Sequence, residues 1–172
     1  YSSTLFLSPL ANKRVDEYGG SIDNRARFLV EIVDAIKEVW PDDKILSLRV
    51  SGEEYLPEGN HPDDLAYIIS LIKNKIDLID ISSGGVVSVP IKTFPGYQLG
   101  FARVIKEKTH LPTIGGGLIT EAEMADEAIN KSDVDMVFFG RELLRNPYFA
   151  LNAAKQLNID IEWPKPYMRG KL

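Results

Sequence analysis

The stretch from Pro112 to Arg141, PTIGGGLITEAEMADEAINKSDVDMVFFGR, contains two short apolar runs, and each run leads directly into glycine. The runs Pro112–Gly115 and Asp135–Phe139 have the length and composition of buried strands. Between them, Glu121–Asn130 has a helical pattern, and Thr120 is placed to cap this helix. A strand, a helix and a second strand in this order predict two parallel strands joined by a crossover helix.

The same pattern recurs on both sides of this stretch. Helices are expected at Asp23–Trp40, from Pro62 onward, at Leu99–Lys108 and at Pro147–Leu157, and strands at Ile45–Val50 and Leu78–Ser82. Ser21 is the expected N-cap of the first helix, and Pro62 suits the first turn of the second, which should bury Leu65, Ile68, Ile69 and Ile72. Four strand-then-helix units call for a parallel α/β sheet, either doubly wound or part of a (β/α)8 barrel.

The residues after the strands favour the barrel. Polar or glycine residues end every strand, namely Arg49-Val50-Ser51, Ser82-Ser83-Gly84-Gly85, Gly115-Gly116-Gly117 and Gly140-Arg141. Barrel enzymes place their sites at these strand ends and often bind phosphate after the last two strands, whereas doubly wound folds concentrate glycines after the first strand. A full barrel has about 250 residues. We therefore expect residues 1–172 to form the C-terminal half of one barrel domain, with the other four strands missing from this sequence or supplied by another chain.

Composition excludes several kinds of site. The chain has 172 residues, a net charge of −5, no cysteine and two histidines, His61 and His110, far apart in sequence. Cysteine-based catalysis, disulfides and Cys metal sites are excluded, and a His-based metal site is not expected. The charge gives no reason to expect nucleic acid or an anionic membrane as a partner, and no apolar stretch approaches a membrane span. These features are typical of a cytoplasmic protein.

Two neighbouring glycine loops could bind a phosphate group. Gly115, Gly116 and Gly117 lie between a strand and a helix, where backbone N–H groups can approach an anion. A tight turn that requires positive φ would explain the same glycines. Gly140 and Arg141 follow the next strand, so the guanidinium would point to the same corner, unless it pairs with its neighbour Glu142. Together the two loops favour a phosphate-bearing cofactor or substrate.

Arg49 lies in an otherwise apolar strand and must find acceptors, because an unpaired buried charge is very costly. A structural partner is available in Asp80 on the next strand, and an anionic or carbonyl-rich ligand is the alternative. From composition alone, Tyr1 would pass as a surface aromatic residue and Arg169 as part of an unstructured tail.

Several longer motifs carry a resemblance to a known family. They are Phe6-Leu7-Ser8-Pro9-Leu10-Ala11-Asn12-Lys13-Arg14, Asp16-Glu17-Tyr18-Gly19-Gly20-Ser21, Asn24-Arg25-Ala26-Arg27-Phe28, Leu48-Arg49-Val50-Ser51, Asp77–Gly84, Phe94–Gln98 and Phe139–Pro147. They cover essentially the whole chain. The sequence resembles the Old Yellow Enzyme family, and within it most closely the bacterial NADPH dehydrogenases that reduce activated alkenes.

The resemblance implies a (β/α)8 barrel that holds FMN at its C-terminal rim. This chain corresponds to the part of that barrel from the end of the fourth strand onward. It places Arg49 at the pyrimidine edge of the flavin, where a positive charge stabilises the anionic reduced form. It places Gly115–Gly117 and Gly140-Arg141 at the FMN phosphate. The glycine triplet is richer in glycine than the subclass pattern.

The resemblance also gives roles to the two terminal residues. Tyr1 matches the tyrosine that donates a proton to the substrate α-carbon, a task that suits a phenol protonated at neutral pH. Arg169 matches a C-terminal arginine that reaches into the neighbouring subunit's active site, which implies a homo-oligomer. The family's substrate-binding His or Asn pair and its first three strands lie upstream of Tyr1 and are absent from this sequence.

The function implied is that of a flavin enzyme. Hydride passes from NADPH or NADH through FMN to the C=C bond of an α,β-unsaturated carbonyl compound, and the 172-residue chain alone is expected to be inactive. One alternative is a phosphate-binding barrel enzyme of another reaction class, such as an aldolase or isomerase, although no strand ends in the lysine that Schiff-base chemistry requires. The other alternative is a non-catalytic half-barrel.

Overall fold

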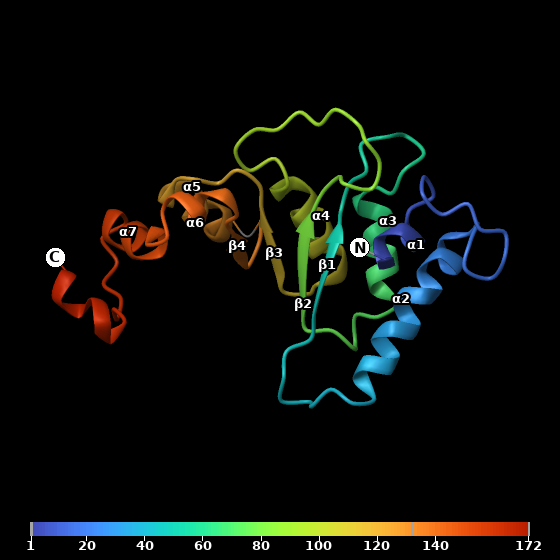
Figure 1. Cartoon of the computed structure of the whole chain (residues 1–172), viewed down its shortest axis with the longest axis horizontal. Coiled ribbons are helices and arrows are strands. Elements are labelled where there is room, and N and C mark those ends of the chain that lie inside the picture. Colours follow the sequence, from blue (N-terminus) through green and yellow to red (C-terminus); the bar gives the residue numbers. More distant parts are fainter. Residues whose placement is uncertain (1, 132, 172) are drawn as a thin grey trace.

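A computed structural model of the chain describes residues 2–131 and 133–171, and it has the predicted alternation of strands and helices (Figure 1). The elements are α1 (Ser2–Leu7), α2 (Ile22–Lys37), β1 (Ser47–Ser51), α3 (Pro62–Ser70), β2 (Leu78–Ser82), α4 (Leu99–Thr109), β3 (Thr113–Gly116), α5 (Ala122–Asn130), β4 (Met136–Phe138), α6 (Arg141–Arg145), α7 (Phe149–Gln156) and the 3-10 helix η1 (Lys165–Gly170). Of these described helices, none is long and apolar enough to cross a membrane.

The four strands form one parallel sheet in the order β1-β2-β3-β4. Arg49 on β1 pairs in register with Asp80 on β2, Asp80 pairs with Ile114 on β3, and Gly116 on β3 pairs with Phe138 on β4. Neighbouring strands of the sheet are therefore consecutive in the chain, each joined to the next by a helical crossover. This topology is the one that a (β/α)8 barrel requires of four successive units.

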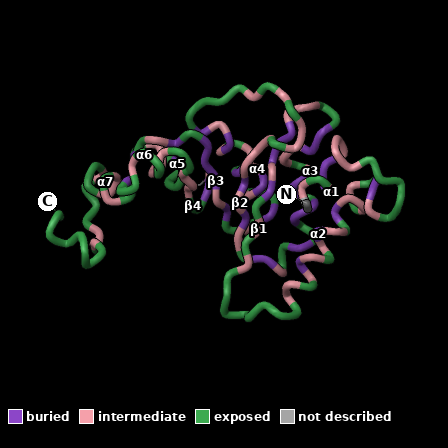
Figure 2. The backbone as a smooth tube through the Cα atoms, viewed as in Figure 1, coloured by how far each residue is buried: buried purple, intermediate pink, exposed green. Residues whose placement is uncertain are grey.

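The core lies between the sheet and the helices α3 and α4; in Figure 1, α4 lies behind the strands and α3 lies to the right of β1. The four α3-region residues expected in the core are at most 1% exposed, namely Leu65, Ile68, Ile69 and Ile72. Ile79 and Ile81 on β2 are fully buried against them. Burying each such side chain contributes about 1.5–3 kcal/mol. Figure 2 shows that the buried residues gather around β1 to β3 and become sparse toward the C-terminus.

The capping predictions have mixed outcomes. Ser21 caps α2 as predicted, since its Oγ accepts a 3.2 Å hydrogen bond from the Asn24 amide. The cap assigned to Thr120 is wrong: the N-cap of α5 is Glu121, and the Thr120 hydroxyl bonds the Glu121 carboxylate instead of a backbone amide.

Three further predictions about helix ends and the tail are corrected. The first long helix ends at Lys37 and does not reach Trp40, although the Trp40 amide still donates a 2.8 Å hydrogen bond to the Ile36 carbonyl. Pro41 has no amide hydrogen with which to continue the helix. The last α-helix begins at Phe149, two residues later than expected. The tail, expected to be unstructured, contains η1 and with it Arg169.

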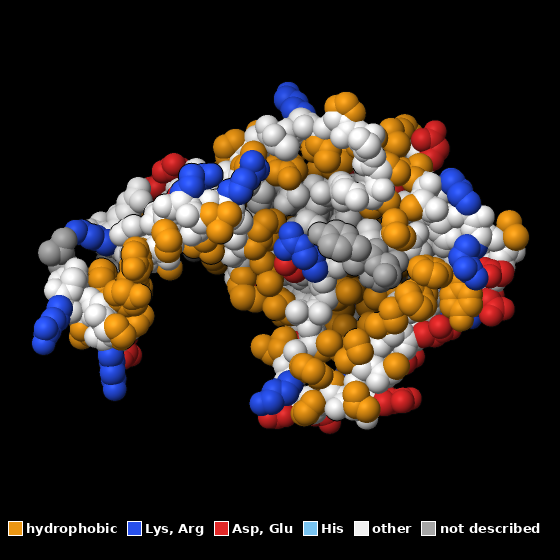
Figure 3. Space-filling view, in the orientation of Figure 1, with side chains coloured by type: hydrophobic (Ala, Val, Ile, Leu, Met, Phe, Trp, Pro, Cys, Tyr) orange, Lys and Arg blue, Asp and Glu red, His pale blue; other side chains and the backbone are white. Residues whose placement is uncertain are grey.

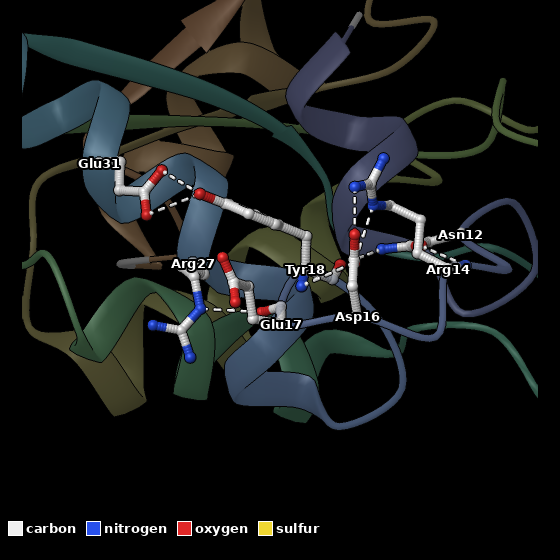
Figure 4. A network of polar contacts seen from close by, with 7 residues as sticks. All are labelled: Asn12, Arg14, Asp16, Glu17, Tyr18, Arg27 and Glu31. Atoms are coloured by element: carbon white, nitrogen blue, oxygen red, sulfur yellow. Dashed lines mark hydrogen bonds and ion pairs between the residues drawn. The ribbon is translucent and has the colours of Figure 1, made fainter.

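Polar contacts fix the N-terminal loop between α1 and α2. Asn12 Nδ2 donates hydrogen bonds to the carbonyl oxygens of Phe6 (2.7 Å) and Tyr18 (2.6 Å), so it closes the loop. Arg27 on α2 donates a 2.8 Å hydrogen bond to the carbonyl of Glu17. Figure 4 shows the network of Asn12, Arg14, Asp16, Glu17, Tyr18, Arg27 and Glu31. Since most of this segment belongs to the motifs quoted above, these contacts explain its residue types as structural.

The sheet is open at both edges and on one face. Among the described residues, β1 and β4 each have one strand neighbour, and the face of the sheet turned toward the viewer in Figure 1 lacks the helical layer that covers the back. The segment with α7 and η1 extends away from the sheet, and Figure 3 shows a hollow between it and the body, faced by apolar side chains. The fold is half of a (β/α)8 barrel.

Candidate functional site

Alternate residues of β1 and β2 point away from the helices. Val50, Ile79 and Ile81 are buried against the helical layer, and side chains alternate along a strand. Arg49 and Asp80 therefore lie on the opposite, inner face of the sheet. Arg49 Nη1 donates a 2.5 Å hydrogen bond to Asp80 Oδ2, which confirms the structural pairing considered from the sequence. The Arg49 side chain remains 52% exposed, so it can also meet a ligand.

The glycine triplet after β3 divides into two packing positions and one loop position. A Cβ on Gly115 would lie 2.5 Å from Val134 Cγ1 and 2.9 Å from Ala102 Cβ, so this glycine permits close helix packing. A Cβ on Gly116 would lie 2.7 Å from the Phe138 carbonyl oxygen. Both residues are buried. Of the three glycines, only Gly117 lines the cavity described below.

Gly117 is held in a conformation that other residues rarely adopt. Its φ is +98°, and a Cβ there would lie 2.8 Å from the Tyr97 ring. Its carbonyl accepts a 2.6 Å hydrogen bond from the Gly96 amide, so the loop after β3 is fastened to the loop before α4. Leu118, the next residue, also has positive φ, at +55°. Strained backbone of this kind is concentrated at functional sites.

A cavity of about 290 Å³ opens at the carboxyl ends of β3 and β4. It is lined by Arg49, Tyr97, Gln98, Gly117, Leu118, Ile119, Thr120, Phe138, Phe139, Gly140, Arg141, Glu142 and Arg145. Arg49, Gly117, Gly140 and Arg141 were all singled out from the sequence, and the fold brings them to one cavity. A Cβ on Gly140 would meet no atom within 4 Å, so glycine leaves open space there.

The charge of this cavity suits an anion. Three guanidinium groups line it, from Arg49, Arg141 and Arg145, against the single carboxylate of Glu142. That carboxylate accepts a 2.6 Å hydrogen bond from Arg145 and is not paired with Arg141, the pairing considered from the sequence. Arg141 therefore remains available for a phosphate, which guanidinium groups bind through charge-assisted hydrogen bonds.

A second cavity of about 500 Å³ continues the site across β1 and β2. Its lining is rich in hydroxyl groups and glycine, and comprises Thr4, Arg49, Val50, Ser51, Ser82, Ser83, Gly84, Gly85 and Gln98. Arg49 and Gln98 line both cavities, so the two join at these side chains. A polar groove with a cationic corner could hold an extended ligand that has a phosphate at one end and a polar ring system at the other.

A hydrogen-bonded group of side chains lies where the two cavities join, and the sequence analysis did not predict it. Gln98 is 5% exposed, and its Nε2 donates hydrogen bonds to Ser83 Oγ (2.9 Å) and Tyr97 Oη (3.0 Å). The Tyr55 hydroxyl lies 2.6 Å from the same Ser83 oxygen, and burial raises the pKa of this phenol. The signal available in the sequence was the Phe94–Gln98 motif, which places Tyr97 and Gln98 immediately before a helix.

Two of the candidate site residues, Tyr1 and Arg169, lie near the ends of the chain. Arg169 lies on η1, is exposed, and lines neither cavity. Tyr1 lies outside the described residues. Within residues 2–131 and 133–171, no group of three or more His, Asp or Glu side chains is arranged to hold a metal ion.

The fold is that of half a barrel, and the cavity at the carboxyl ends of its last strands has a lining that suits an anion. Residues 1–160 match the NADH:flavin oxidoreductase / NADH oxidase family. The chain belongs to this family, which confirms the resemblance to the Old Yellow Enzyme group. The alignment includes every cavity residue named above, and the family's cofactor is FMN.

Similar proteins support the same assignment. The chain is 49% identical to an NADPH dehydrogenase of Clostridium acetobutylicum over 171 residues, and 48% identical to one of Bacillus subtilis over 166 residues. These alignments cover 99% and 96% of this chain but 50% and 48% of the relatives. The chain therefore spans about half the length of the curated relatives it matches.

Solved structures of flavoenzymes with barrel folds share the arrangement. A complex of 2-naphthoyl-CoA reductase matches with a TM-score of 0.82 and 27% identity, over 90% of this chain and 24% of that one. Morphinone reductase in complex with tetrahydroNAD matches with a TM-score of 0.67 and 25% identity, over 95% of this chain and 42% of that one.

Proposed function

We propose that residues 1–172 form the C-terminal half of a single FMN-binding barrel domain, and that the complete protein is an NAD(P)H-dependent ene-reductase. The observation that carries this proposal is the convergence of Arg49, Gly117, Gly140 and Arg141 on one arginine-rich cavity. The glycines and guanidinium groups of that cavity fit a phosphate, and the adjoining polar groove fits a flavin ring. Family membership favours this function over a sugar-phosphate aldolase or isomerase.

Each residue then has a defined task. Gly117 and Gly140 allow backbone to approach the phosphate, and Arg141 neutralises its charge. Arg49 presents its guanidinium to the pyrimidine edge of the flavin and stabilises negative charge there. Bound FMN would supply hydride transfer between NADPH or NADH and the C=C bond of an α,β-unsaturated carbonyl compound. Tyr1 is proposed as the acid that protonates the substrate α-carbon.

The open edges and open inner face of the sheet support the proposal that four more strands complete the barrel. The edges of β1 and β4 expose unpaired backbone groups, and the inner face exposes Met136. Closing the barrel would cover both edges and enclose the flavin groove, so the chain alone is proposed to be inactive. Arg169, which lies on the extended C-terminal segment, is proposed to reach a neighbouring subunit of a cytoplasmic homo-oligomer.

Anaerobic stopped-flow absorption of the complete protein tests the reaction. Mixing with NADPH or NADH should bleach the visible flavin bands, and a second mixing with 2-cyclohexenone should restore them. Saturated cyclohexanone is the matched control and should leave the flavin reduced. Flavin that is bleached by NADPH but reoxidised equally slowly by both ketones would contradict ene-reduction and leave only the dehydrogenase half-reaction.

A further inference from the structure

The guanidinium of Arg49 is contacted by one residue on β2 and one on β4. Arg49 Nη1 bonds Asp80 on β2, and Arg49 Cζ lies 4.8 Å from the centre of the Phe138 ring on β4. Strands β1 and β4 are separated by three strand spacings, or about 14 Å. The arginine and the phenylalanine therefore approach each other across the two middle strands, and the guanidinium is fixed from two directions.

Gly116 on β3 makes this approach possible. A Cβ at that position would lie 3.2 Å from two carbons of the Phe138 ring and 2.7 Å from its carbonyl oxygen. Any larger residue would displace the ring from its position beneath Arg49. Gly116 thus leaves room for the ring that supports Arg49, whereas Gly117 and Gly140 line the cavity itself.

Asp80 is the acidic partner of Arg49. It lines neither cavity, and its side chain is 20% exposed, against 52% for Arg49. Its Oδ2 accepts the hydrogen bond from Arg49, and its Oδ1 is buried without a hydrogen-bond partner among the described residues. Through this hydrogen bond Asp80 can act on a ligand in the groove by orienting the guanidinium and by offsetting its positive charge.

We propose that Asp80 is a positioning residue for Arg49 and that its carboxylate, paired with Arg49, holds the reduction potential of the bound flavin below the value that an unopposed Arg49 would give. The inference rests on the proposed function, because it requires FMN beside Arg49. An unopposed guanidinium stabilises the negative charge of reduced flavin, and a carboxylate hydrogen-bonded to that guanidinium weakens this stabilisation. Asp80 thereby keeps reduced FMN a stronger hydride donor toward the alkene.

The test is the midpoint potential of FMN bound to the complete protein, measured by dye equilibration for wild type, Asp80→Asn, Asp80→Glu and Asp77→Asn. Asparagine keeps an acceptor for Arg49 and removes only the charge, whereas Asp80→Glu retains the charge. Asp77 lies three residues earlier and accepts a 2.8 Å hydrogen bond from the Leu46 amide, so it controls for the substitution itself.

Asp80→Asn should shift the equilibrium toward reduced flavin about tenfold, which is about 30 mV for a two-electron couple. Asp80→Glu and Asp77→Asn should stay near wild type. An unchanged potential in Asp80→Asn, or an equal shift in Asp77→Asn, would overturn the inference. So would an Asp80→Asn protein that is folded by circular dichroism but no longer binds FMN. A wild type without FMN would instead refute the proposed function, so the two failures are distinguishable.

Discussion

The hydroxyl of Ser8 donates a 2.8 Å hydrogen bond to Oε2 of Glu54, and both residues are buried. Asn60 Nδ2 donates to the other carboxylate oxygen of Glu54 at 3.3 Å and to the Leu7 carbonyl at 2.9 Å. These contacts fasten the segment after α1 to the loop that follows Arg49 on β1. A buried carboxylate requires such donors, because its desolvation is otherwise uncompensated.

Removing the Ser8 hydroxyl should therefore destabilise the protein. We expect Ser8→Ala to lower the free energy of unfolding by about 1–3 kcal/mol, the penalty for leaving a buried acceptor without its donor. Urea denaturation of the complete protein measures this change. Ser70→Ala is the matched control, because Ser70 is exposed on α3, and its effect should stay within about 0.5 kcal/mol. Equal effects of the two substitutions would argue against a structural role for the Ser8–Glu54 contact.

Glu54 should also give the stability a pH dependence. Burial raises the pKa of its carboxyl above the ordinary value of 4.5. The folded state then binds more protons than the unfolded state between the two pKa values, so this contribution to stability falls as pH rises from 4.5 through the raised value.

Glu54→Gln, whose amide can still bond Ser8 and Asn60, removes this titration. The free energy of unfolding of the variant minus that of wild type should become more positive with rising pH and level off above the raised pKa. Urea denaturation at a series of pH values measures this difference, and the titration of other groups such as His61 cancels in it. A difference that does not change between about pH 4 and about pH 8 would show that Glu54 has the same pKa in both states.

Gly117 should be required for tight binding of FMN. Alanine at a φ of +98° is strained, and its methyl group would lie 2.8 Å from the Tyr97 ring, so the loop after β3 must move. We expect Gly117→Ala to weaken FMN binding about tenfold, as measured by flavin fluorescence. Gly100→Ala in α4 is the control, since its Cβ would meet no atom within 4 Å; it should leave affinity unchanged. Wild-type affinity in Gly117→Ala would remove this loop from the proposed site.

Arg141 should recognise the phosphate specifically. Loss of a charge-assisted hydrogen bond of about 1.5–3 kcal/mol would weaken FMN binding about tenfold to about a hundredfold in Arg141→Ala. Riboflavin lacks the phosphate, so its affinity should be the same in the variant and the wild type. Titrations of both ligands measure this, with Arg103→Ala as a control because Arg103 lies on α4 outside the cavity. A parallel loss for riboflavin would mean that Arg141 supports the flavin ring or the fold instead.

The sequence was sufficient to predict the parallel half-barrel because hydrophobic spacing is local. The strand Leu78–Ser82 has its predicted bounds, and the four core residues of the α3 region are buried as expected. Helix ends were less predictable because they depend on individual hydrogen bonds, as at Thr120, whose hydroxyl bonds a neighbouring carboxylate.

The site residues were likewise predictable where local sequence order places them, and unpredictable where their role depends on contacts in three dimensions. Arg49 lies near the carboxyl end of β1, and Gly117, Gly140 and Arg141 come just after β3 and β4, so strand alternation was enough to bring them to one rim. The separate roles of Gly115 and Gly116 depend on what a Cβ would touch in three dimensions, which no spacing rule contains. The same holds for Phe138, whose ring reaches Arg49 across two strands.

We expect FMN to bind at the carboxyl end of this sheet. The most direct measurement is the FMN released on denaturing the complete purified protein, after incubation with FMN and removal of the free ligand, expressed per polypeptide. We expect one FMN per barrel, with visible flavin absorption before denaturation. A folded protein that retains no FMN after this treatment would contradict this expectation.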